Sequence, residues 1–158
     1  MKKDQTLLAQ DEGEGWTLTV KNSLEEMAKL PGYVDSLGEA LQLTVRDAMS
    51  IRLALEESLL NAIKYAYPKN ETGKITVKAT YNPTQSAIHF ELSDNGKPFD
   101  PTQVPYAKPK LGIDEMPIGG LGIFLMRKHV DKVTYRREDG KNRLIMTKTI
   151  KNNKIWKE

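Results

Sequence analysis

The chain has 158 residues, of which 39% are hydrophobic and 28% charged, a composition typical of one soluble globular domain. Its net charge of +3 is scattered along the chain rather than gathered in blocks, which argues against direct binding of nucleic acid. The lack of cysteine excludes disulfides, thiolate metal sites and a cysteine nucleophile, and no apolar run reaches the ~18 residues of a membrane span, so we expect a cytoplasmic protein without membrane contact.

The first elements are a strand and a helix. Residues 15–21 (GWTLTVK) alternate in polarity and contain β-branched side chains, which predicts a strand. Asn22 or Ser23 then caps a helix, with Glu26 in place to act as the capping-box partner of Ser23. Pro31, followed by a glycine, is expected to interrupt or kink this helix before it resumes.

A second helix and a hairpin follow. Thr44 is a suitable N-cap for a helix that runs to about Tyr67 and is stopped by Pro68. Residues 74–81 and 86–94 alternate with a period of two and are joined by a short turn, which predicts a β-hairpin.

The last third contains a long irregular stretch and a second hairpin. Residues 96–118 are rich in proline, glycine and lysine and lack periodicity, and a loop of that length is usually functional or disordered, so we expect a lid. A glycine-rich turn then enters a short apolar helix over 119–130. Two further strands close the chain around the turn Asp139-Gly140.

Strands joined by hairpins, with helices in between, favour a two-layer α/β (α+β) sandwich over a doubly wound parallel sheet. The expected sheet is mixed but mostly antiparallel. We expect residues 1–158 to form a single domain, with flexible termini over 1–14 and 151–158.

The helix segment ALEESLLNAIKYAY carries an unusual polar stripe. Glu57, Asn61 and Lys64 are spaced i, i+4 and i+7 and therefore lie on one side of the helix. A solvated helix face would explain such a stripe. A binding cavity lined by these side chains would explain it equally, and other motifs of the chain favour the cavity.

Two glycine motifs support a ligand site. In SDNGKPFDP, Asp94 at a strand end can accept a hydrogen bond from an exocyclic amine, and Gly96 lets a flat ring approach the backbone, although both also suit a simple turn. In GGLG, the glycines over 119–122 precede a helix whose N-terminal amides favour an anion, although they would also permit a tight bend.

These motifs, in this order, resemble those of the GHKL ATPases, the superfamily that includes the catalytic domains of histidine kinases. Within it the chain is most similar to the anti-sigma factor serine/threonine kinases of bacterial partner-switching systems. EESLLNAIKYAYP matches the Asn box, SDNGKPFDP the first glycine box and PIGGLGIFLMRKHVDKVTY the second. The match covers nearly the whole chain and implies a Bergerat-type fold, with helices on one face of the sheet, that binds ATP and Mg²⁺.

The resemblance also implies roles for single residues. Glu57 matches the general base and Asn61 the ligand of Mg²⁺. Lys64 stands where related ATPases often carry a basic residue near the phosphates. Asp94 matches the aspartate that reads adenine, with Gly96 giving clearance.

Other matches concern the phosphates and the last strand. Gly119, Gly120, Leu121 and Gly122 would offer amides to the phosphates and hinge the lid. Where many members have a threonine that helps to bind adenine, this chain has Asn142. It also lacks the basic residue often found just before the second glycine box, since residues 116–118 are Met-Pro-Ile; a lysine of the lid, Lys108 or Lys110, would have to replace it.

The resemblance implies a protein kinase that binds a sigma factor in one state and phosphorylates a STAS-type antagonist protein in another, and it suggests a homodimer. An alternative is an ATP-gated protein-binding module with little or no phosphotransfer, which the missing basic residue favours and the intact Glu57 opposes. A detached histidine-kinase catalytic domain would need a histidine-bearing dimerisation domain, and none precedes residue 15 of this sequence.

Overall fold

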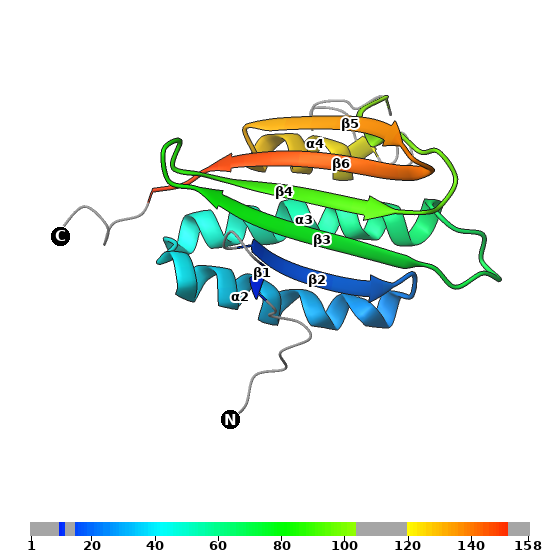
Figure 1. Cartoon of the computed structure of the whole chain (residues 1–158), viewed down its shortest axis with the longest axis horizontal. Helices are drawn as coiled ribbons and strands as arrows, with labels where there is room; N and C mark the ends of the chain where they lie inside the picture. Colours follow the sequence, from blue (N-terminus) through cyan, green and yellow to red (C-terminus); the bar gives the residue numbers. More distant parts are fainter. Residues whose placement is uncertain (1–9, 12–14, 104–119, 152–158) are drawn as a thin grey trace.

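A computed structural model of the chain describes residues 10–11, 15–103 and 120–151. A six-stranded sheet, with the strand order β1-β2-β3-β4-β6-β5, forms one layer, and the helices cover one of its faces (Figure 1). Every strand pair described is antiparallel. The strands are β1 (Gln10–Asp11), β2 (Gly15–Lys21), β3 (Lys74–Asn82), β4 (Ala87–Asp94), β5 (Lys132–Glu138) and β6 (Lys141–Thr149).

Within the described ranges, the helical layer consists of three α-helices and two short 3-10 segments. Its main helix, α3, packs against both α2 and α4 and against the central strands β3 and β4. The helices are η1 (Leu24–Lys29), α2 (Leu30–Leu41), α3 (Val45–Tyr65), η2 (Pro101–Gln103) and α4 (Gly120–His129). The predicted two-layer α+β architecture and the predicted order of its main elements are confirmed.

Alternation along the strands decides which side chains face the helices. Along β4, Ile88, Phe90 and Leu92 are buried in the core between sheet and helices. Asp94 is the next residue in the same alternation and is therefore buried as well, at the end of the strand. In β6, Asn142 lies directly opposite Asp94 and is also buried. The hydrophobic pattern thus carries two polar side chains to the helix side of the sheet.

The start of the first helical region differs from its prediction. The capping box is not formed, because residues 24–29 form a 3-10 segment and Ser23 makes no side-chain cap. The Glu26 carboxylate instead accepts hydrogen bonds from the backbone N–H of Lys21 at 2.9 Å and from the Lys29 ammonium at 3.1 Å. Pro31 lies in the first turn of α2, where its missing N–H costs no helical hydrogen bond, so it follows the break instead of interrupting a helix.

The boundaries of α3 follow local chemistry. Thr44 is the N-cap, as predicted, and its hydroxyl accepts a hydrogen bond from the N–H of Asp47 at 3.0 Å. The helix ends at Tyr65, two residues earlier than expected. Lys97 donates its N–H to the carbonyl of the C-cap residue Ala66 at 2.8 Å, so the loop after β4 is bonded to the end of this helix.

The two predicted hairpins are confirmed, whereas β1 was not predicted. Asp139 and Gly140 both have positive φ angles, 54° and 73°, which fits the tight turn between β5 and β6. Gln10 and Asp11 pair with β2, within the segment expected to be a flexible terminus. In the described part of the chain, no helix is both long and apolar enough to cross a bilayer.

The bond between α2 and β2 gives a test of the packing. Tyr33 is fully buried, and its hydroxyl donates to the carbonyl of Trp16 at 2.8 Å. We expect Tyr33→Phe to lower the free energy of unfolding by about 1 kcal/mol, the net value of a typical hydrogen bond, as measured by urea denaturation. Tyr81→Phe is the matched control, because no bond of the partly buried Tyr81 is seen among the described residues. Equal midpoints for both variants would contradict this assignment.

Candidate functional site

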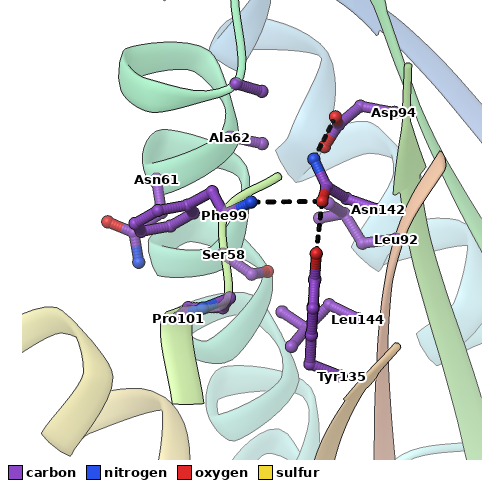
Figure 2. A pocket seen from close by; sticks show the side chains of 11 residues that line it. Ser58, Asn61, Ala62, Leu92, Asp94, Phe99, Pro101, Tyr135, Asn142 and Leu144 are labelled. Carbon is purple, nitrogen blue, oxygen red and sulfur yellow. Dashed lines mark hydrogen bonds between the residues drawn. The ribbon is translucent and has the colours of Figure 1, made fainter. Parts of the chain in front are cut away.

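A cavity lies between the C-terminal half of α3 and the helix-facing side of the sheet (Figure 2). The empty space between the lining residues is about 310 Å³, including the open side. Apolar side chains form most of the wall and a few polar groups converge on it. The lining residues are Ser58, Asn61, Ala62, Ala66, Leu92, Asp94, Phe99, Pro101, Tyr135, Asn142 and Leu144.

Asp94 offers one free acceptor to this cavity. Only 6% of the residue is exposed. Its Oδ1 accepts hydrogen bonds from the N–H of Gly96 at 2.8 Å and from the Asn142 amide at 2.9 Å. Among the described residues no donor bonds its second oxygen, Oδ2. A buried carboxylate held in this way can still accept a hydrogen bond from a ligand amine.

Packing against the end of α3 requires a glycine at position 96, whether or not a ligand binds. A Cβ atom on this residue would lie 2.1 Å from the carbonyl oxygen of Ala66, which is backbone and cannot move aside. The loop after β4 therefore approaches the end of α3 too closely for any side chain. The missing side chain of Gly96 thus gives room to the end of α3. Its role in giving room to the flat ring of a ligand stays a prediction.

Asn61 carries an unsatisfied polar atom. The residue is 9% exposed, and its Nδ2 is buried without a hydrogen-bond partner in the described part of the chain. Leaving such a group unpaired costs roughly 1–3 kcal/mol, so a buried orphan amide calls for a partner. Rotation of the amide by half a turn would present its oxygen instead. The residue thus fits a role in holding a ligand or a metal ion.

Glu57 lies one turn before Asn61 but in a different environment. Partial burial raises the pKa of its carboxyl, the negative charge of Glu56 raises that pKa further, and the ammonium of Lys64 lowers it. The side chain faces the first turn of α4, where a Cβ atom on Gly122 would lie 3.5 Å from the Glu57 carboxylate. A half-buried carboxylate with a raised pKa is suited to take up a proton.

The remaining candidates are divided between two places. Lys64 is exposed and lines a separate surface depression together with Asn22, Leu24, Ile63, Tyr65, Tyr67 and Lys69. Gly120 and Leu121 form the start of α4. Gly119 and most of the predicted lid, including Lys108 and Lys110, fall in residues 104–119, outside the described ranges. The structure therefore brings together Asn61, Asp94 and Asn142, places Glu57 beside Gly122, and leaves Lys64 apart.

Two aromatic residues of the site were missed by the sequence analysis. The Tyr135 hydroxyl donates to Asn142 Oδ1, and the Phe99 ring lies with its centroid 5.3 Å from that of Tyr65. Alternation along residues 132–138 could have assigned Tyr135 to one face of a strand. The hairpin of β5 and β6 was predicted, but the hydrogen bond from Tyr135 to Asn142 within it was not.

Comparisons with known proteins show the family of the chain. The model of the histidine kinase-like ATPase domain family matches residues 20–148. The serine/threonine-protein kinase BtrW of Bordetella bronchiseptica is 29% identical over 132 residues, which cover 80% of this chain and 92% of that protein. The serine-protein kinase RsbW of Staphylococcus aureus strain JH9 is 32% identical over 117 residues, which cover 71% of this chain and 72% of that protein.

Two solved structures have the same fold. The RsbU and RsbW domains of a Mycobacterium tuberculosis protein superpose with a TM-score of 0.62 at 13% identity, covering 86% of this chain and 32% of that chain. The histidine kinase domain of a blue-light activated kinase from Erythrobacter litoralis gives a TM-score of 0.52 at 15% identity, covering 78% of this chain and 60% of that chain. From its family match and its curated relatives, the chain belongs to the histidine kinase-like ATPase family and, within it, to the group of serine/threonine-protein kinases of the RsbW type.

Proposed function

We propose that this protein is a cytoplasmic serine/threonine kinase that transfers the γ-phosphoryl group of ATP to a serine of a STAS-type antagonist protein, and that it sequesters a sigma factor when it is not engaged with that antagonist. The assignment to the serine/threonine-protein kinases follows from the family to which the chain belongs. The two protein partners rest on the resemblance of the three sequence motifs to the anti-sigma kinases. A homodimer, also suggested by that resemblance, stays a prediction.

The observation that carries the proposal is the pairing of two incomplete polar groups across one cavity. Asn61 has a buried amide without a partner, and Asp94 has a buried carboxylate with one unbonded oxygen. Both residues line the cavity, and Figure 2 shows Asn61 on α3 and Asp94 at the end of β4. A nucleotide would satisfy both, because its base carries an amine and its phosphates bring a metal ion.

In this proposal the unbonded oxygen of Asp94 accepts a hydrogen bond from the exocyclic amine of adenine. The apolar wall around it, with Leu92 and Leu144, excludes water from the base. With its amide rotated, Asn61 would offer its oxygen to Mg²⁺, a cation that prefers oxygen ligands and would neutralise the charge on the phosphates. The first turn of α4, from Gly120 to Gly122, offers backbone amides to the phosphates. The role of Lys64 near the phosphates, which the resemblance implies, stays a prediction, because Lys64 is exposed at a separate depression.

Glu57 acts as the general base. The serine oxygen of the antagonist attacks the γ-phosphorus, the bond from that phosphorus to the bridging oxygen of ADP breaks, and the serine proton moves to the Glu57 carboxylate. The raised pKa of Glu57 favours this acceptance, since a base works best when its pKa approaches the operating pH. Most of the rate enhancement is expected from positioning and charge stabilisation.

The transfer is tested with γ-labelled ATP, Mg²⁺ and candidate STAS-domain proteins from the same genome. We expect label on a partner serine, and Glu57→Gln should reduce it by roughly 10²–10⁴-fold while ATP binding is kept, because the amide cannot take up the proton. Glu56→Gln is the matched control and should stay active at neutral pH. ATP binding without any labelled partner would favour the ATP-gated binding module, and full transfer by Glu57→Gln would refute the base assignment.

The pH dependence gives a second test. Because burial and the neighbouring Glu56 raise the pKa of Glu57, acidification should protonate Glu57 and abolish transfer at a higher pH than for an ordinary glutamate. Glu56→Gln removes one of the two causes, so its loss of activity should move to lower pH. The measurement is a pH–rate profile of kcat at saturating ATP and substrate. A profile that Glu56→Gln leaves unmoved would contradict this electrostatic account.

The metal role of Asn61 is tested separately. Asn61→Ala should abolish the Mg²⁺-dependent part of ATP binding, measured by titration calorimetry with Mg²⁺ and with EDTA. In EDTA the variant and the wild type should bind alike. Since the Asn61 Nδ2 bonds none of the described residues, the truncation removes no hydrogen bond there, and thermal unfolding should show a folded protein. Wild-type affinity in the presence of Mg²⁺ would remove Asn61 from the metal site.

A further inference from the structure

The loop after β4 is held in place by the hairpin at the edge of the sheet. Arg137 of β5 donates from Nη1 to the carbonyl of Gly96 at 2.8 Å. Asn142 of β6 donates from Nδ2 to the carbonyl of Lys97 at 2.8 Å and accepts at Oδ1 from the N–H of Phe99 at 3.2 Å. Two neighbouring strands thus make three hydrogen bonds to the backbone of residues 96–99, which we call the base loop.

Asn142 uses its whole hydrogen-bonding capacity in these contacts. A side-chain amide has two N–H donors and an oxygen with two lone pairs. The donors go to Asp94 Oδ1 and to the carbonyl of Lys97, and the oxygen accepts from the Phe99 N–H and from the Tyr135 hydroxyl. Figure 2 shows the bonds to Asp94, Phe99 and Tyr135. The residue is 5% exposed. A direct bond from Asn142 to a nucleotide would therefore require one of these four bonds to break.

Strand register explains why these side chains act together. Arg137 lies directly opposite Asn142 in the β5–β6 ladder, and Tyr135, two residues earlier, lies on the same face. The residue between them, Arg136, points to the other face, where it forms an ion pair with Glu138 at 3.7 Å. The edge strand therefore presents Tyr135 and Arg137 to the base loop and Arg136 away from it.

From these contacts we infer that Tyr135, Arg137 and Asn142 are positioning residues for nucleotide recognition, which fix the base loop so that the free oxygen of Asp94 faces the cavity. This inference rests on the proposed binding of ATP. Asn142 then serves the nucleotide by holding Asp94 and the loop, rather than by the direct contact with adenine that the sequence resemblance implied. Arg137, on an edge strand, controls affinity without touching the ligand.

Arg137→Met is the decisive variant. It keeps the apolar stem and removes one hydrogen bond from a charged donor, so we expect roughly tenfold weaker binding of ATP with Mg²⁺ in equilibrium titrations. Once ATP saturates the variant, kcat should equal that of the wild type, because the reacting groups are untouched. Arg137→Lys should recover part of the affinity. Arg136→Met, on the same strand but facing away, should bind ATP as the wild type does.

Amide hydrogen exchange of the nucleotide-free protein tests the positioning itself. Arg137→Met should raise the exchange rates of residues 96–99. Its melting temperature and its exchange rates in β3 should equal those of Arg136→Met. Unchanged exchange in the base loop, or equal ATP affinity of Arg137→Met and Arg136→Met, would overturn the inference. A wild-type protein that binds no ATP would instead overturn the proposed function, so the two failures are distinguishable.

Discussion

The site depends on one buried hydrogen bond between neighbouring strands, from the Asn142 amide to the Asp94 carboxylate. A buried carboxylate costs several kcal/mol unless donors satisfy it. Here the amide and the N–H of Gly96 share one oxygen, so the charge is supported and the other oxygen remains available. Because Asp94 and Asn142 are opposite each other in the β4–β6 ladder, the geometry of the sheet brings this pair together.

Helix α3 contributes two polar side chains whose surroundings differ although they lie on one stripe. Asn61 is buried against the cavity with an unpartnered amide, whereas Glu57 is half-buried and faces the start of α4. The start of α4 lies beside Glu57, whereas Asn61 lines the cavity. In the proposed mechanism, the group that holds a ligand and the group that accepts a proton come from consecutive turns of one helix.

Much of the fold could be predicted from the sequence, since strong alternation and a good cap are local signals. The strand over 15–21, the cap at Thr44 and the turn at Asp139-Gly140 are confirmed at the expected positions. The predicted capping box at Ser23 was wrong. Residues 24–29 form a 3-10 segment, and the Glu26 carboxylate accepts a hydrogen bond from the N–H of Lys21 instead. Strand β1 carries too few residues to give a pattern and exists only through its pairing with β2.

The sequence by itself determined which polar residues interrupt apolar periods, and these are Asn61, Asp94 and their neighbours in the three motifs. Tertiary structure alone decided how each is used. Lys64 belongs to the same helical stripe as Asn61 yet lies exposed at a separate depression, and Asn142 is saturated by four hydrogen bonds. The physical reason is that periodicity fixes the face on which a side chain lies, whereas its hydrogen-bond partners come from strands and loops far away in the chain.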